Sequence, residues 1–93
     1  MKRVVRTEAY LADLDDIMAY IAQDNAQAAT DMWLNIDDQV TNLADPNFPR
    51  RPGRVKNTKE LVAHPNYIVI LKEDAMTVHA LNVVHARKKY PLK

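Results

Sequence analysis

The spacing of apolar residues predicts a short strand and two helices in the first half of the chain. Val4 and Val5 favour a strand over residues 2–6. Thr7 is a suitable helix N-cap, and Asp24 or Asn25 can cap a second helix that Pro46 ends. Between these signals apolar side chains recur every three or four residues, as in amphipathic helices. These positions are Leu11, Leu14, Ile17, Met18 and Ile21 in the first helix and Ala28, Ala29, Met32, Trp33, Ile36, Val40 and Leu43 in the second.

Three strand-like runs follow a proline-rich loop in the second half. Residues 45–53 contain three prolines and the only glycine, so they form the main loop. The runs span residues 59–64, 67–72 and 76–84, and short turn-forming pairs separate them. Strands joined this closely pair as an antiparallel meander. The order β-α-α-β-β-β therefore predicts an α+β fold, with a helical hairpin packed on one face of an antiparallel sheet of about four strands.

Length and composition narrow the possible classes of protein. A chain of 93 residues forms one domain, here residues 1–93, with one small core. The absence of cysteine excludes disulfides and thiolate metal sites and suits a reducing cytoplasm. The basic N-terminus is not followed by a long apolar run, so we expect a cytoplasmic protein with neither signal peptide nor membrane span. No cofactor is expected.

The charges are unevenly distributed along the chain. Residues 1–46 carry three basic and nine acidic side chains, whereas residues 47–93 carry ten basic and three acidic ones. This asymmetry predicts a partner with a negative surface, either a nucleic acid or an acidic protein. The candidate binding residues lie in the proline-rich loop and the C-terminal tail. They are Arg50, Arg51, Arg54, Lys56, Arg87, Lys88 and Lys89.

A series of segments runs along the chain in a distinctive order: 12–17, 20–22, Arg51-Pro52-Gly53-Arg54-Val55, Thr58-Lys59-Glu60-Leu61-Val62, Tyr67-Ile68-Val69 and residues 83–91, which read VVHARKKYP. In this order and spacing they resemble the RelE/ParE toxins of type II toxin–antitoxin systems, and ParE-like members most closely. The resemblance implies the same fold and a cognate antitoxin that holds the toxin inactive in a hetero-oligomeric complex. It also implies that the antitoxin's C-terminal segment wraps the sheet and helices, and that freed toxin arrests growth.

The resemblance leaves two modes of action open. ParE-like toxins inhibit DNA gyrase and need a contact surface but no catalytic residue. RelE-like toxins cleave mRNA on the ribosome, which requires acid–base groups and cations for the charged phosphorane. Ile68 occupies the position where a RelE-like catalytic arginine is expected. We therefore prefer gyrase inhibition. The alternative is a ribosome-dependent mRNA endoribonuclease with His85, Arg87 and Tyr90 as its catalytic set.

Two further interpretations are weaker. Asp13, Asp15 and Asp16 point in different directions around a helix, so we expect no metal site there. A generic nucleic-acid-binding module would account for the basic half, and its affinity would fall steeply with salt. That hypothesis leaves the toxin-like segments unexplained.

Overall fold

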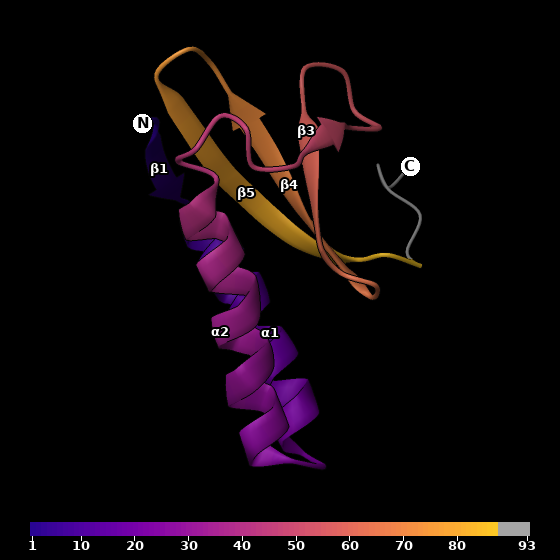
Figure 1. Ribbon diagram of the computed structural model, residues 1–93. Coiled ribbons are helices and arrows are strands. Elements are labelled where there is room, and N and C mark those ends of the chain that lie inside the picture. The colour runs from indigo at the N-terminus through magenta and orange to yellow at the C-terminus, as the bar shows by residue number, and fades with distance from the viewer. Residues whose placement is uncertain (88–93) are drawn as a thin grey trace.

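The computed structural model describes residues 1–87, in which two helices and five strands follow one another (Figure 1). The elements are β1 (Arg3–Arg6), α1 (Glu8–Ala22), α2 (Ala26–Asn42), β2 (Arg51–Pro52), β3 (Lys59–His64), β4 (Tyr67–Glu73) and β5 (Thr77–His85). Neither helix in this range combines the length and apolar composition of a membrane-spanning segment.

Both helices begin where the capping residues predict. The Thr7 side chain accepts a hydrogen bond from the Tyr10 amide at 3.1 Å, and its hydroxyl lies 2.9 Å from the carbonyl oxygen of Ala80 in β5. Asn25 accepts one from the Ala28 amide at 3.0 Å. These caps satisfy amide groups that the helices leave unpaired. Thr7 also ties the start of α1 to the sheet.

The sheet order is β1-β5-β4-β3-β2. The α+β class and the helical hairpin on one face are confirmed, but the sheet differs from the prediction in two respects. It has five strands rather than about four, because Arg51 and Pro52 pair with Glu60 and Lys59 to form β2. It is also mixed rather than antiparallel, because β1 pairs in parallel with β5. No local turn signal announces a pairing between segments so distant in sequence.

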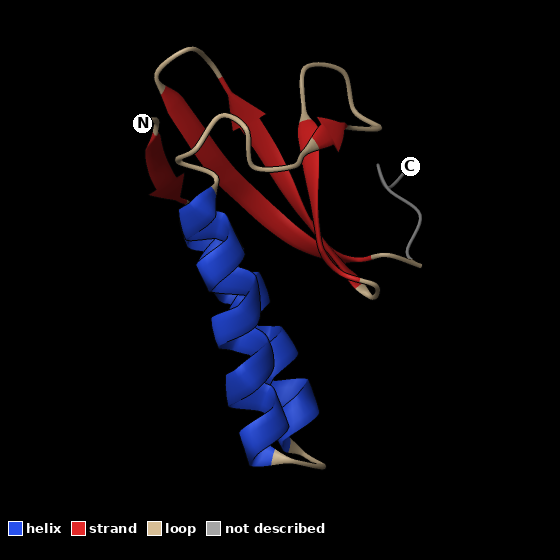
Figure 2. Cartoon of the chain, in the orientation of Figure 1, coloured by secondary structure: helices blue, strands red, loops and turns tan. Residues whose placement is uncertain are grey.

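The core lies between the helical hairpin and one face of the sheet (Figure 2). Its helical side includes Leu14, Ile36 and Val40, all fully buried, as the spacing predicts. The predicted stripe of the first helix is displaced, however, since Leu11 and Met18 are each 38% exposed and Tyr10 is fully buried instead. The hydrophobic core therefore begins one residue earlier than expected. The core residues are Tyr10, Leu14, Ile36, Val40, Leu43, Leu61, Ala63, Val69, Leu71, Val78, Ala80 and Val83.

Tyr10 can be buried because its hydroxyl group has a partner. It donates to Asp37 Oδ1 at 2.9 Å, and Arg6 Nε donates to the same oxygen at 2.8 Å. Burial, with smaller contributions from the hydrogen bond and charge of Asp37, raises the pKa of Tyr10 far above its ordinary value. The phenol therefore stays protonated and donates. This buried polar group links β1, α1 and α2.

The two layers carry opposite charge. Residues 8–42, which contain both helices, include eight acidic side chains and no Lys or Arg. The far half of the hairpin projects past the end of the sheet (Figure 2). Trp33 is partly buried against the core, and its indole nitrogen donates to Asp15 at 3.1 Å. The basic side chains of the described residues lie in strands β1 to β4, in the segments next to these strands and in the turn after β5.

Candidate functional site

Several exposed basic residues of the second half lie on or beside one loop at the edge of the sheet. We call residues 53–58, which join β2 to β3, the cationic loop (Figure 1). Arg54 and Lys56 are exposed, and Val55 between them is 37% exposed. Arg51, just before the loop, has a side chain that is 54% exposed. The loop therefore presents an apolar residue flanked by two cations.

A buried carboxylate, Glu60 of β3, holds the base of this loop. Glu60 is only 1% exposed. One of its oxygens accepts from the Arg51 guanidinium at 3.0 Å, and the other accepts from the Arg54 amide at 3.2 Å. Burying a carboxylate without partners is very unfavourable, so these bonds are a condition of the local fold. Glu60 thus connects the residues on both sides of Gly53.

The cationic loop is also closed by bonds within itself. The Gly53 amide donates to the Thr58 carbonyl at 2.8 Å, and the Thr58 hydroxyl donates to the Val55 carbonyl at 2.6 Å. A Cβ atom on Gly53 would overlap Thr58 Oγ1, which explains why glycine is needed here. Asn57 adopts a positive φ of 67°, a conformation that asparagine tolerates better than most residues.

Arg50 lies beside the loop but does not share its exposure. Its side chain is 5% exposed and bonds Glu73 at 3.0 Å and the carbonyl of Leu43 at 3.3 Å. Lys2 and Lys59 also reach Glu73, at 2.8 and 3.0 Å. The Arg50 side chain therefore lacks the exposure expected of the basic loop, although the residue borders the groove described below. Its charge is used to anchor the proline-rich loop to the sheet.

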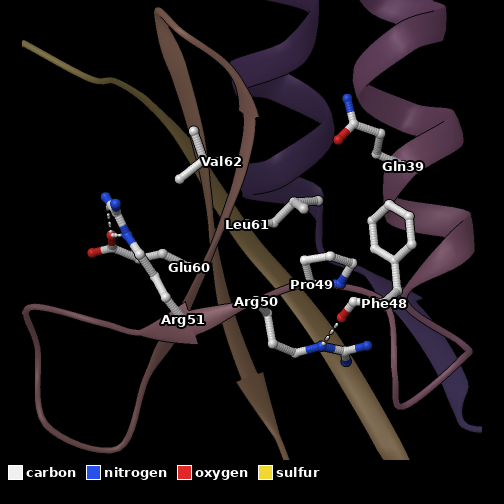
Figure 3. A pocket seen from close by; sticks show the side chains of 8 residues that line it. All are labelled: Gln39, Phe48, Pro49, Arg50, Arg51, Glu60, Leu61 and Val62. Atoms are coloured by element: carbon white, nitrogen blue, oxygen red, sulfur yellow. Dashed lines mark hydrogen bonds and ion pairs between the residues drawn. The ribbon is translucent and has the colours of Figure 1, made fainter.

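A groove of about 470 Å³ runs along the edge of β3 beside β2 and the end of α2 (Figure 3). Leu61 points toward Phe48 and Pro49 on one side of β3, while Glu60 and Arg51 lie on the other. Val62, which is 47% exposed, adds a further apolar side chain. The complete lining is Gln39, Phe48, Pro49, Arg50, Arg51, Glu60, Leu61 and Val62.

Two of the candidate catalytic residues, His85 and Arg87, lie beside the His64 end of β3, away from the cationic loop. His85 pairs with Tyr67, which pairs with His64, and the Tyr67 and His85 ring centroids are 5.5 Å apart. His85 Nδ1 accepts a hydrogen bond from the Arg87 amide at 3.1 Å. This bond uses the Nδ1 lone pair, which a general base would need in order to accept a proton. Tyr90, the third member of the set, lies outside the described residues.

The predicted basic cluster is therefore divided. Arg87 lies in a turn, two residues beyond the end of β5 at His85. The alternation of side chains along a strand therefore does not place Arg87 on the same face as His85. The cationic loop adjoins Lys59, whereas Arg87 adjoins the His64 end of β3. At about 3.3 Å per strand residue, the two ends are roughly 15–20 Å apart. Lys88 and Lys89 lie outside the described residues.

Three other positions considered in the sequence are occupied structurally. Ile68, in β4, is 2% exposed. Asp13 accepts from the Val83 amide at 2.9 Å, and Asp15 accepts from Trp33. Among residues 1–87 no three His, Cys, Asp or Glu side chains are grouped as a metal site would require.

Two residues of the site were not singled out from the sequence. Glu60 appeared only as part of a family-like segment, although a lone carboxylate between apolar strand residues and near three arginines was an available signal. Phe48 lay in a loop without periodicity, so nothing in the local pattern indicated that it would pack against the core.

The whole chain is similar to known toxins. The family model described as ParE toxin of type II toxin-antitoxin system, parDE, matches residues 4–90. A protein named "Putative toxin Y4kP" from Sinorhizobium fredii is 37% identical over 90 residues, which cover 97% of this chain and 94% of that protein. A chain from the chromosomal ParDE TA system of P. aeruginosa has the same fold, with a TM-score of 0.79 at 20% identity, covering 91% of this chain and 96% of that one.

These likenesses carry different weight. The solved structure is too distant in sequence to support more than the fold. The family match and the identity to the Sinorhizobium protein each extend over nearly all of the chain, including the cationic loop and β3 to β5. The chain therefore belongs to the ParE toxin family of type II toxin–antitoxin systems.

Proposed function

We propose that this toxin inhibits DNA gyrase by binding it, without chemistry of its own on a nucleic acid. The observation that carries the proposal is Ile68, an isoleucine 2% exposed at the position where a RelE-like nuclease is expected to have an arginine. An isoleucine can neither stabilise the charged phosphorane nor donate a proton to the leaving oxygen. The match to a ParE family model points the same way.

The alternative is ribosome-dependent mRNA cleavage by His85, Arg87 and Tyr90. In the arrangement described, the Nδ1 atom of His85 already accepts a hydrogen bond from the Arg87 amide. To act as a general base for the 2′-hydroxyl through Nδ1, His85 would first have to give up this bond. We therefore rank nuclease activity second.

A pair of assays separates the two activities. Purified toxin is added to gyrase, ATP and relaxed plasmid, and in parallel to a translating extract that contains a defined mRNA. We expect supercoiling to stop, or cleaved DNA to be trapped, with the mRNA left intact. The ranking would be reversed if the mRNA acquired new 5′ ends within codons while gyrase was unaffected, and if an Arg87→Ala variant no longer produced these ends.

A toxin of this kind has a cognate antitoxin as its partner. We propose that the antitoxin occupies the groove beside β3. The groove offers Phe48, Pro49 and Val62 to apolar side chains, and the half-exposed Arg51 to an acidic one. The helical layer, with eight acidic residues and no basic ones, would repel an acidic segment, so charge also favours the sheet edge.

A further inference from the structure

We propose that Glu60 is a positioning residue that holds the cationic loop in one conformation, and that the tip of this loop contacts the target. We further infer that the loop binds a protein surface of the target, and that this surface has a small apolar hollow bordered by carboxylates. This inference rests on the proposed function, since it names the surface through which gyrase would be bound.

The first argument is the way Glu60 is bonded. Its two carboxylate oxygens have separate partners, the Arg51 guanidinium and the Arg54 amide, on either side of Gly53. With 1% of Glu60 exposed, neither bond is readily replaced by water. A buried charge with two partners in fixed directions restricts both ends of the loop.

The second argument is that the remaining loop bonds leave little freedom at the tip. The Thr58 amide and hydroxyl both donate to the Val55 carbonyl, at 3.1 and 2.6 Å. The Gly53 amide closes the loop on the Thr58 carbonyl at 2.8 Å. A loop already held in its binding conformation loses less conformational entropy when a partner is bound. Gly53, Val55 and Thr58, which make these bonds, are not part of the hydrophobic core.

The third argument concerns the kind of partner. Val55 is 37% exposed between two exposed cations, Arg54 and Lys56. A phosphate backbone would pair with the cations but would offer nothing to the valine. A protein socket lined by apolar atoms and bordered by carboxylates would complement both the exposed valine and the positive charge around it. We therefore assign the loop to a protein contact.

The test compares two buried carboxylates at the same end of the sheet. Glu60→Gln disturbs the cationic loop, whereas Glu73→Gln disturbs Arg50 and Lys59 without touching residues 53–58. Val55→Ser is an exposed change that should leave folding intact. For each variant, induced growth arrest is titrated in cells, and melting temperature and amide hydrogen exchange are measured on purified toxin.

We expect Glu60→Gln to weaken growth arrest about tenfold, and Val55→Ser about fivefold at an unchanged melting temperature, as for residues central to an interface. Exchange at the Arg54 amide should accelerate in Glu60→Gln only. Arrest at wild-type strength in both variants would overturn the proposal. The proposal would also be overturned if, in Glu60→Gln and Glu73→Gln alike, the loss of growth arrest is proportional to the drop in melting temperature. Glu60 would then have only a structural role.

Two further results bear on the partner and on the proposed function. One pattern would point to nucleic acid: target binding falls steeply with salt and is weakened by Lys56→Ala but not by Val55→Ser. The protein assignment then fails. If wild-type toxin arrests growth without affecting gyrase, the proposed function fails, but the variants still test the loop through growth arrest. Wild-type toxin that neither arrests growth nor affects gyrase would overturn both the proposed function and the role of the loop.

Discussion

Two glutamates, Glu60 and Glu73, are buried at the same end of the sheet and are stabilised in different ways. Glu60 binds one guanidinium and one backbone amide. Glu73, with a side chain 5% exposed, is bonded by Lys2, Arg50 and Lys59. Burial by itself raises the pKa of Glu73, but the hydrogen bonds from Lys2 and Lys59 and the charge of Arg50 lower it below its ordinary value.

The lowered pKa of Glu73 predicts a pH-dependent contribution to stability. A group with a depressed pKa stabilises the fold fully above its unfolded value, here 4.5, and loses this contribution as the pH falls through the folded value. We expect Glu73→Gln to lower the free energy of unfolding by about 2–3 kcal/mol at pH 7. The difference from wild type should shrink in acid.

Thermal unfolding of both proteins at pH 7 and at pH values below 4.5 measures this effect. Asp16→Asn, at an exposed position of α1, is the control for general loss of negative charge. A difference between wild type and Glu73→Gln that stays constant with pH would show that the carboxylate does not contribute through its charge.

At the scale of the element, β2 is held less by its own strand pairing than by hydrogen bonds made around it. It pairs over two residues only, and Glu60 and the Gly53–Thr58 bond secure its far end. Such a short strand has little stability alone, because each residue it orders costs conformational entropy. The geometry at Gly53 should therefore decide whether β2 and the cationic loop keep their shape.

This dependence can be tested with Gly53→Ala. The added Cβ would overlap Thr58 Oγ1 and lie 3.0 Å from the Thr58 backbone carbonyl, so the loop must open. We expect a loss of about 1–3 kcal/mol in the free energy of unfolding, as for overpacked sites. Gly53→Ala combined with Thr58→Ala should recover only part of this loss, since the contacts with backbone remain. Full stability in Gly53→Ala alone would contradict the close approach.

At the scale of the whole molecule, an acidic helical layer covers one face of a sheet whose edge is basic and partly apolar. The groove beside β3 is bordered by Arg51, while Glu60 and Glu73 nearby are both neutralised by cations. The edge thus attracts negative charge and the helices repel it. An acidic antitoxin segment with apolar side chains should therefore bind at this edge.

Val62→Gln tests where the antitoxin binds, and Met76→Gln is its matched control. Both side chains are exposed, at 47% and 74%, but only Val62 lines the groove. We expect Val62→Gln to weaken antitoxin binding about tenfold, as for an apolar contact near the centre of an interface, and Met76→Gln to leave it unchanged. Titration calorimetry with purified antitoxin measures both. Equal affinity for the two variants would place the antitoxin elsewhere.

The sequence alone determined the features that depend on neighbouring residues. Thr7 and Asn25 cap the helices as predicted, and Lys59–His64 is the strand that the pattern indicates. Helical period, capping and turn residues all act over a few positions, so they can be recognised without knowing what packs nearby. The family resemblance, too, consisted of short segments in order.

Only the tertiary structure decided which distant groups meet. Arg50 and Arg51 are adjacent and chemically identical, yet one is buried on Glu73 and the other is half-exposed on Glu60. The parallel pairing of β1 with β5 joins residues more than seventy positions apart. Tyr10 entered the core because Asp37, on the other helix, could accept its hydroxyl. Burial of a polar group depends on the partner it finds in space, and sequence spacing does not encode that partner.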